Sequence, residues 1–550
     1  MAKPCLLLAF CSFFFFFFLP CLTCPAHQKQ ALLQFKSSIL AITSSLNSSD
    51  SQLQSWNSSS SCCRWEEVEC NDSTTSWLHI SDNNIQGEIP AVGFANLSNL
   101  VGLYMLGNNF SGSIPPQLFH LPFLQYLSLD GNSLSGEVPE EFGNLTSLQG
   151  LQELDLSDND LSMKIPREIG NLLNISTLAL SNNRLTGGIP SSMQKLSKLK
   201  KLYLQNNLLT GEIPSCLFSG ASLGVLALSR NNFSGELPIN IGDAAFLRIL
   251  MLSGNNFSGP IPQSLIHVPY LRLLDLSRNR FSGGLPWNLT NLSKLERLEL
   301  QDNKLTGELP NFLSQISTLQ VLNLRNNSFQ GLIPESIVNL SNLRILDVSN
   351  NNLTGEIPRD ISSDNLNMYT LLDLSNNQLS GQIPASLGTL RALKLLNISH
   401  NKLSGKIPTS FGDLENIETL DLSHNKLSGS IPPTLTKLQQ LTILDVSNNQ
   451  LTGRIPDGAM VFMGRCVYWV PSWIVVGNWN HISYRVFYLT TTFKRPPASP
   501  ISSKSSNQAM ELNQNIGSRA VSTSSEFHGM AEDLWLSKRY LHRVKCKIKN

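Results

Sequence analysis

The side chains best suited to covalent chemistry are four cysteines near the N-terminus. Cys62, Cys63 and Cys70 stand close together in the chain, and Cys24 precedes them. Thiols at such spacing either bind a metal ion or form disulfides. No histidine lies beside them at ligand spacing, which disfavours a zinc site. We therefore predict the disulfides Cys24–Cys62 and Cys63–Cys70 and no bound metal, and we interpret Cys216 as a small apolar filler.

Side chains that could catalyse a reaction are scattered along the chain. Of the nine histidines, His400 and His424 recur at one repeat position, where we interpret them as turn residues. The sequence contains no Gly-rich phosphate loop, no His-Glu-x-x-His motif, no Gly-x-Ser-x-Gly motif and no kinase loop signature. Asp and Glu also recur at equivalent positions of successive repeats, and the repeat pattern explains this without a catalytic role. We predict that the chain is not an enzyme and uses no cofactor.

Side chains suited to binding recur six, four and two positions before a repeated asparagine. Asp and Ser are the commonest residues four and two positions before the asparagine, as in Asp275 and Ser277, and we interpret them as ordinary consensus residues of the repeat surface. Departures from this consensus are better candidates for ligand contact, because Tyr and Arg combine contact area with directional polar groups. The predicted ligand-binding residues are Tyr104, Tyr126, Asp130, Lys201, Tyr203, Gln205, Met251, Arg297, Glu299, Gln301 and Arg325.

These side chains are positioned by one repeat, L-x-x-L-x-L-x-x-N-x-L-x-G-x-I-P-x-x-L-x-x-L. Twelve of the fifteen intervals between its asparagines are 24 residues long, and the others are 25, 27 and 26. All sixteen units have Pro seven places after the Asn, and fifteen have Gly four places after it. The repeated asparagines are Asn83, Asn108, Asn132, Asn159, Asn183, Asn207, Asn231, Asn255, Asn279, Asn303, Asn327, Asn351, Asn377, Asn401, Asn425 and Asn449.

Each position of the repeat has a physical role. The apolar residues five and three places before the Asn alternate with polar ones, which predicts a short strand with one buried face. The Asn amide is expected to pair with backbone groups of its own and the adjacent turn, which would otherwise cost about 1–3 kcal/mol each. Gly permits a positive φ, and Pro needs no N–H partner. Because one unit cannot bury its own leucines, neighbouring units must stack.

The predicted fold is therefore a leucine-rich-repeat solenoid, an α/β-type superhelix. We expect a parallel sheet on the concave face, an irregular or 3-10 convex side, and a disulfide-linked cap at the N-terminus. The cap contains an amphipathic helical stretch from Ala31 to Leu40, followed by Trp56. The predicted domains are a signal peptide at 1–23, the cap at 24–75, sixteen repeats at 76–456 and an irregular, partly disordered tail at 457–550.

Charge and targeting features indicate a secreted protein. Lys3 and an apolar stretch that ends with the run Phe13 to Phe18 are typical of a signal peptide. The 41 basic and 40 acidic residues give a net charge of +1, which makes nucleic acid an improbable partner. Fifteen Asn-x-Ser/Thr sequons agree with a glycosylated protein. They are Asn47, Asn57, Asn71, Asn96, Asn109, Asn144, Asn174, Asn232, Asn256, Asn288, Asn291, Asn326, Asn339, Asn352 and Asn397.

The region after Pro456 departs from the repeat. Its most apolar stretch, 467–476, is about ten residues long and is interrupted by Pro471, whereas a spanning helix needs ~20. We therefore expect no membrane span in this chain. The basic end from Lys538 to Lys549 is interpreted as a solvated tail, with binding to a membrane surface or a partner as the alternative.

The repeats and the cap resemble those of plant leucine-rich-repeat receptor-like proteins. The resemblance rests on Leu-Asp-Leu-Ser-His-Asn-Lys-Leu-Ser-Gly-Ser-Ile-Pro at 420–432 and on Cys-Cys-x-Trp-x-x-Val-x-Cys at 62–70, and it covers residues 24 to about 457. It implies a cell-surface or apoplastic module that binds a peptide, protein or glycan on its concave face. The family signals through partner receptor kinases in defence or development.

The sequence also departs from that family. The family's C-terminal cap is not found in 457–480, and its acidic segment and membrane span are missing as well. Anchoring in the plasma membrane is therefore implied by the resemblance alone. A two-residue excess at 361–369 resembles a shortened form of the island that interrupts many members. A second hypothesis is a soluble inhibitor of microbial wall-degrading enzymes, such as polygalacturonases, whose repeat arrays are shorter. Unchanged polygalacturonase activity at excess protein would remove that alternative.

Overall fold

A computed structural model describes residues 24–43, 52–71, 74–139, 150–219, 222–359, 368–454 and 456. The chain divides into two units, Met1–Ile482 and Ser483–Asn550, and every described residue belongs to the first. Several predictions fall outside the described residues: the signal peptide, the tail after Pro456, the sequons Asn47 and Asn144, and most of the excess at 361–369.

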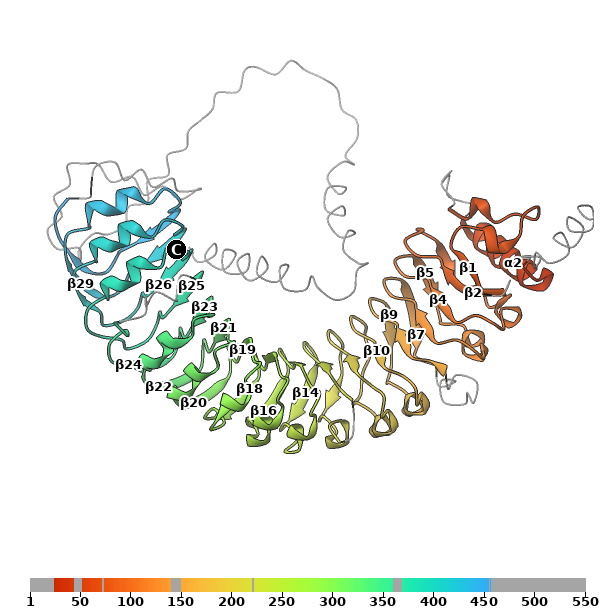
Figure 1. The fold of residues 1–550 in the computed structure, drawn as a ribbon, viewed down its shortest axis with the longest axis horizontal. Coiled ribbons are helices and arrows are strands. Elements are labelled where there is room, and N and C mark those ends of the chain that lie inside the picture. The colour runs from red at the N-terminus through yellow and green to blue at the C-terminus, as the bar shows by residue number, and fades with distance from the viewer. Residues whose placement is uncertain are drawn as a thin grey trace, which may run out of the picture. The chain divides into compact units, whose positions relative to one another are not determined.

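The inner side of the stacked coils is one sheet of 17 strands (Figure 1). β1 (Val68–Asn71) pairs antiparallel with β2, and each later strand pairs in parallel with the strand of the next repeat, as β11 does with β13. This confirms the predicted parallel concave sheet. Its parallel strands are β2 (Thr74–His79), β4 (Gly102–Tyr104), β6 (Tyr126–Ser128), β8 (Glu153–Asp155), β10 (Thr177–Ala179), β11 (Lys201–Tyr203), β13 (Val225–Ala227), β15 (Ile249–Met251), β17 (Leu273–Asp275), β19 (Arg297–Glu299), β21 (Val321–Asn323), β23 (Ile345–Asp347), β25 (Leu371–Asp373), β26 (Leu395–Asn397), β28 (Thr419–Asp421) and β30 (Ile443–Asp445).

A second set of strands, which the sequence did not predict, follows the repeated asparagine in most coils. These strands form separate parallel sheets along one side of the stack, as where Ser258 and Gly259 of β16 pair with Arg280 and Phe281 of β18. They are β3 (Gln86–Glu88), β5 (Asn109–Gly112), β7 (Ser133–Glu137), β9 (Asp160–Ser162), β12 (Thr210–Gly211), β14 (Asn232–Gly235), β16 (Asn256–Pro260), β18 (Arg280–Gly283), β20 (Lys304–Glu308), β22 (Ser328–Leu332), β24 (Asn352–Thr354), β27 (Ser404–Gly405), β29 (Lys426–Gly429) and β31 (Gln450–Leu451).

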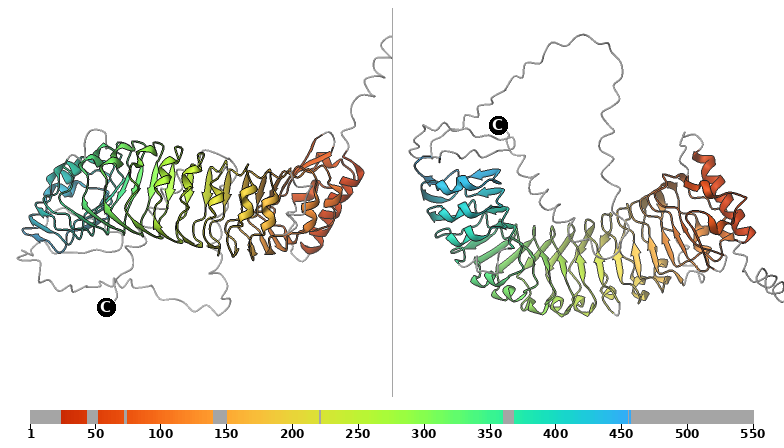
Figure 2. Two further views of the ribbon diagram at one scale, coloured as in Figure 1. Left: turned by 90° about the horizontal axis from the view of Figure 1, so that it is seen from below. Right: turned by 45° about the horizontal axis from the view of Figure 1, so that its top comes forward.

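The outer side of the coils carries short 3-10 helices, as predicted, and the right-hand view of Figure 2 shows them opposite the concave strands. Most begin directly after the repeat proline, as η8 does after Pro190. Their bounds are η3 (Phe94–Asn96), η4 (Pro116–His120), η7 (Arg167–Asn171), η8 (Ser191–Lys195), η9 (Ser215–Leu217), η10 (Ile241–Asp243), η11 (Gln263–His267), η12 (Leu289–Asn291), η13 (Asn311–Gln315), η14 (Glu335–Asn339), η15 (Ala385–Thr389), η16 (Thr409–Asp413) and η17 (Pro433–Lys437).

The repeated asparagine joins neighbouring coils as predicted. Asn207 Nδ2 donates to the carbonyls of Leu180 in the preceding coil (2.9 Å) and of Leu204 in its own coil (3.1 Å). Its Oδ1 accepts from the backbone N–H of Leu185 in the preceding coil (2.9 Å). The residue before the Asn has a positive φ, 56° at Asn206, so the chain turns sharply away from the concave strand.

The N-terminal cap closes one end of the leucine core. In α2 (Ala26–Thr43), Leu32 and Phe35 are buried, and the Phe35 ring packs edge-on to Phe94 of η3 at 5.6 Å. η1 (Gln52–Ser55) and η2 (Cys62–Arg64) follow. The two predicted disulfides are present, with Cα–Cα distances of 5.4 Å for Cys24–Cys62 and 5.5 Å for Cys63–Cys70.

Within the described ranges, no helix combines the length and apolar character needed to cross a bilayer.

Candidate functional site

All eleven predicted ligand-binding residues lie on the concave strands or within two residues of their ends. The structure divides them into separate groups along the sheet. Tyr104, Tyr126 and Asp130 lie near the cap. Lys201, Tyr203 and Gln205 follow three to four coils later, and Met251 lies on β15. Arg297, Glu299, Gln301 and Arg325 lie near the middle of the array.

Four aromatic rings form a continuous surface on β2, β4 and β6, which we call the aromatic shelf: Trp77, His79, Tyr104 and Tyr126. The rings of His79 and Tyr104 stack at 5.2 Å with an interplanar angle of 8°. The Trp77 ring stacks on Tyr104 at 6.0 Å and on Tyr126 at 5.3 Å. All four side chains are half-buried, so the shelf presents ring surface to the concave side.

Gly102 makes this arrangement of rings geometrically feasible. Gly102 is the register partner of both Trp77 and Tyr126 in the sheet. A Cβ at position 102 would lie 2.0 Å from the Trp77 ring, far inside van der Waals contact. The missing side chain therefore leaves the space in which Trp77 lies flat between β2 and β6.

A carboxylate group borders the shelf, formed by Asp130, Glu153 and Asp155. Glu153 is the register partner of Tyr126, and Asp155 is the partner of Ser128. Among the described residues, none of the three carboxylates forms an ion pair within 4.0 Å. The shelf and the carboxylate group are thus contiguous, and the negative charge beside the rings is not neutralised by a contacting cation.

Burial first, and then repulsion among the carboxylates, raise the affinity of Asp130 and Glu153 for protons. Burial, and after it the charges of Asp155 and Asp158, raise the pKa of Asp130 to about 7. Burial also raises the pKa of Glu153, although nearby Lys201 opposes that shift. On the ring side, burial and then the charge of Glu153 raise the pKa of the Tyr104 hydroxyl. A cation placed among these groups would relieve that repulsion.

Tyr203 and Lys201 lie on the far side of the carboxylate group. Through β10, Lys201 follows Glu153 and Tyr203 follows Asp155 in the same rows of the sheet. Burial, and then the charges of Asp155 and Glu153, raise the pKa of the Tyr203 hydroxyl, which places that ring within the field of both carboxylates. The carboxylate group therefore has aromatic side chains on both sides.

The middle of the concave face carries a polar network instead. Arg297 forms an ion pair with Glu299 at 2.8 Å, and the two side chains are only 18% and 12% exposed. Gln301 Nε2 donates to the other oxygen of Glu299 at 3.1 Å. These three predicted residues are therefore held by one another. Met251 lies half-buried on β15, between Ala227 and Asp275 in the sheet register.

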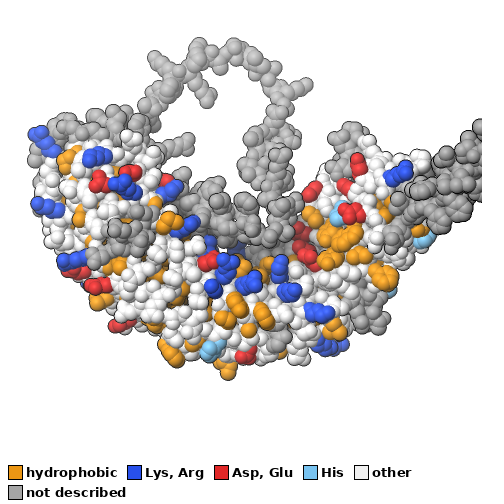
Figure 3. Space-filling view, viewed as in Figure 1, with side chains coloured by type: hydrophobic (Ala, Val, Ile, Leu, Met, Phe, Trp, Pro, Cys, Tyr) orange, Lys and Arg blue, Asp and Glu red, His pale blue; other side chains and the backbone are white. Residues whose placement is uncertain are grey.

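The end of this surface nearest the cap and its middle differ in charge. Figure 3 shows hydrophobic and acidic side chains gathered at the end of the array that holds β2, β4 and β6, and Lys and Arg side chains over its middle. The net charge of +1 conceals this separation.

Several residues of this surface were not among the predicted site residues. Trp77, His79 and Gly102 precede Asn83 or Asn108 by six or four positions, so the positional rule already pointed to them. Asp155 has the consensus Asp-x-Ser filling and was therefore discounted. Only the stacking of the coils shows that Asp155 lies beside Glu153 and Asp130.

The described sequons lie mainly away from the concave strands, for example at the start of β14 (Asn232) and within η14 (Asn339). Two described sequons lie on strands of the concave sheet: Asn71 ends β1, and Asn397 ends β26. Asn397 Nδ2 donates to Asp373 (3.3 Å), and its Oδ1 accepts from the Ser399 hydroxyl (2.7 Å). The Asn397 amide is thus already engaged in the sheet surface.

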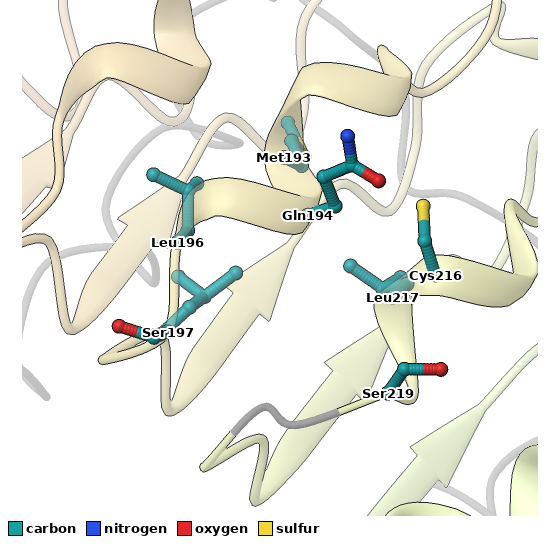
Figure 4. A pocket seen from close by; sticks show the side chains of 8 residues that line it. Met193, Gln194, Leu196, Ser197, Cys216, Leu217 and Ser219 are labelled. Atoms are coloured by element: carbon teal, nitrogen blue, oxygen red, sulfur yellow. The ribbon is translucent and has the colours of Figure 1, made fainter.

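Two further features have structural explanations. The sulfur atoms of Cys24, Cys62 and Cys63 lie within 4.8 Å of one another, and the two disulfides account for this grouping. On the outer side, η8 and η9 leave a small hollow, and Met193, Gln194 and Cys216 are among the residues that line it (Figure 4). Its volume of about 10 Å³ accommodates no more than one water molecule.

Comparison with known families identifies the same two parts of the chain. The leucine rich repeat N-terminal domain family matches residues 25–71. Leucine rich repeat families match 123–145, 150–172, 174–196, 198–219, 246–268 and 270–292, and then 293–353, 367–427 and 407–451.

Curated relatives include plant receptors. Receptor-like protein 46 of Arabidopsis thaliana is 33% identical over 155 residues, which cover 22% of this chain and 19% of that protein. The leucine-rich repeat receptor-like serine/threonine-protein kinase RGI4 of Arabidopsis thaliana is 36% identical over 139 residues, 24% of this chain and 12% of that protein. The matched segments therefore span less than a fifth of either relative.

Solved structures match over far more of the chain. The plant peptide hormone receptor RGFR1, in complex with RGF2, is 33% identical, with a TM-score of 0.61 and coverage of 72% of this chain and 69% of that chain. The Arabidopsis receptor kinase HAESA, in complex with the peptide hormone IDA and the co-receptor SERK1, is 30% identical, with a TM-score of 0.57 and coverage of 78% and 83%. The chain belongs to the leucine-rich-repeat family of plant receptor-like proteins.

Proposed function

We propose that this protein is the extracellular recognition module of a plant cell-surface receptor and that it binds a peptide ligand on its concave sheet. The bound complex passes the signal to a partner receptor kinase in defence or development. Binding involves no catalysis and no cofactor. A peptide is preferred over a larger protein or a glycan because the similar ectodomains of RGFR1 and HAESA were solved with peptide hormones.

One observation carries the proposal: side chains that depart from the Asp-x-Ser consensus lie in distinct groups on one continuous sheet. The aromatic shelf, with Asp130 and Glu153, occupies β2 to β8, and the Arg297–Glu299 pair lies on β19. An extended peptide can contact such groups in sequence because strand spacing is about 4.8 Å. Rigid side chains on a preformed sheet also limit the entropy lost on binding.

The test begins with capture of a ligand. The full chain, secreted from plant cells, is incubated with peptides of apoplastic fluid, and bound peptides are identified by mass spectrometry. A synthetic copy is then titrated against the wild type, against Tyr203→Ala on the concave sheet, and against Phe123→Ala, an exposed side chain that precedes the concave strand β6.

The proposal predicts that Tyr203→Ala weakens binding about tenfold, as truncation of an interface tyrosine commonly does, while Phe123→Ala does not. Binding that is unaffected by Tyr203→Ala and by substitutions of the shelf and of Arg297 would contradict it. The soluble-inhibitor hypothesis predicts inhibition of a polygalacturonase instead.

A further inference from the structure

The end of the concave face nearest the cap has a more specific chemistry than peptide binding in general requires. Three properties coincide there: an accessible surface of stacked rings, a contiguous carboxylate group, and no ion pair to those carboxylates among the described residues. Consensus coils offer none of these, since their outward residues are single Asp and Ser side chains.

We propose that the aromatic shelf and the carboxylate group together bind the arginine side chain of a peptide ligand. This inference rests on the proposed function, because it names the residue of the ligand that this part of the sheet takes. The planar guanidinium stacks on an aromatic face and forms paired hydrogen bonds with a carboxylate, so one side chain can use both surfaces.

The order of residues in the sheet suits such a side chain. In one row Trp77, Gly102, Tyr126 and Glu153 follow one another, and in the next row His79, Tyr104, Ser128 and Asp155 do. Each row therefore passes from ring to carboxylate within one or two strand spacings, about 5–10 Å. A guanidinium lying over Tyr126 or Tyr104 has carboxylate oxygens at its edge.

The charge of the site favours a cation over a neutral ligand such as a sugar, which also stacks on aromatic rings. After burial, the charges of Asp155 and Asp158 contribute to the raised pKa of Asp130, and a neutral ligand would leave the repulsion among these carboxylates in place. Lys201 lies beyond Glu153 by two strands. In the part of the chain that the structure describes, no Lys, Arg or His forms an ion pair within 4.0 Å with any of the three carboxylates.

The experiment measures binding of acetyl-Gly-Ser-Arg-Gly-Ser-amide to the full chain by calorimetry at low ionic strength. The matched ligand carries citrulline, which has nearly the same shape as arginine and no charge. The variants are Tyr126→Ala, Glu153→Gln and Gly102→Ala. The Gly102→Ala substitution removes no aromatic ring, but its Cβ displaces Trp77. The control is Tyr270→Ala, an exposed tyrosine outside the concave strands.

The arginine peptide should bind about tenfold more tightly than the citrulline peptide, and each of the three variants should lower its affinity by about the same factor. Tyr270→Ala should change nothing. The melting temperature of each variant is measured, and the conservative Glu153→Gln decides the outcome if a larger change destabilises the protein.

Equal binding of both peptides, or full binding by the Tyr126→Ala and Glu153→Gln variants, would overturn the inference. Binding of cellohexaose that depends on Tyr126, with none of the arginine peptide, would also overturn it and assign the shelf to a sugar. A natural peptide captured on the concave sheet but insensitive to Tyr126→Ala would defeat this inference and leave the proposed function standing. Failure to capture any peptide, with the arginine preference intact, would defeat the proposed function alone.

Discussion

At the scale of single residues, the repeated asparagine holds each coil to the one before it. Asn255 is buried; its Nδ2 donates to Leu228 O and Leu252 O, both at 3.0 Å, and its Oδ1 accepts from Phe233 N at 3.0 Å. No water or other side chain is expected to replace these bonds inside the turn.

Asn255→Ala should therefore lower the free energy of unfolding by about 3 kcal/mol or more, since each buried backbone group left unpaired costs about 1–3 kcal/mol. Urea denaturation with the disulfides intact measures the loss. The control is Asn311→Ala, an exposed asparagine in η13. Equal stability of the two variants would show that the asparagine ladder is not required.

A buried carboxylate on the concave sheet gives the protein a pH-dependent stability. Burial, and after it the charge of Asp347, raise the pKa of Asp373 to about 7, against an ordinary value of about 4. A carboxyl whose pKa is higher in the folded state than in the unfolded state lowers the free energy of unfolding when it is ionised. This loss of stability reaches its full value above pH 7 and disappears as the pH falls towards 4.

Asp373→Asn should therefore raise the melting temperature at pH 7.5 and have little effect at pH 4. Asn323 and Asn397 occupy the same repeat position, and Asn397 Oδ1 accepts from Ser399 N at 3.1 Å much as Asp373 Oδ1 does from Ser375 N at 3.0 Å. Asn is thus compatible with the site. Thermal unfolding across this pH range, with the exposed Asp413→Asn as control, tests the prediction, and equal shifts at both pH values would refute it.

At the scale of elements, the cap depends on covalent links as well as packing. The Cys24–Cys62 disulfide closes a loop with a sequence separation of 38 and ties the start of α2 to η2. By chain entropy such a loop contributes about 4 kcal/mol.

The pair Cys24→Ala and Cys62→Ala should lower the free energy of unfolding by about 2–4 kcal/mol and expose α2 to limited proteolysis before the repeats. Cys216→Ala, a substitution of the same type at a free cysteine, serves as the control. If α2 is cut no faster in the double variant than in Cys216→Ala, the cap does not depend on this disulfide.

The elements differ in how far the sequence predicted them. The concave strands followed from pairs such as Leu202 and Leu204, both fully buried, and α2 followed from the spacing of Leu32, Phe35 and Ile39. The strands after the asparagine were not predicted, because segments such as 256–260 contain Asn, Gly and Pro, which are rare in strands, and pair only once coils are stacked. The aromatic shelf was half predicted, since Tyr104 and Tyr126 were named and Trp77 was not. Its ring stacking depends on neighbours 25 residues or more apart in the chain.

At the scale of the whole array, each coil contacts mainly its neighbours. The register of the core is therefore set by the repeat length. Removing 24 residues in one piece should preserve it, whereas removing half that length should place polar residues in the core.

Deletion of residues 256–279 should give a secreted protein with an unchanged circular-dichroism spectrum per residue. Deletion of residues 256–267 should abolish secretion, because the leucines of later coils would lose their register. Comparable yields of the two deletions would contradict the repeat register on which the fold depends.

The central claim is that the concave sheet, rather than the outer side, recognises a peptide. The most direct measurement is photo-cross-linking of the captured peptide, synthesised with a diazirine side chain, followed by mass spectrometry of the cross-linked fragments. If the concave sheet binds the peptide, cross-links will form on outward residues of the strands from β2 to β19. Cross-links confined to η4 through η17 on the outer side would contradict it.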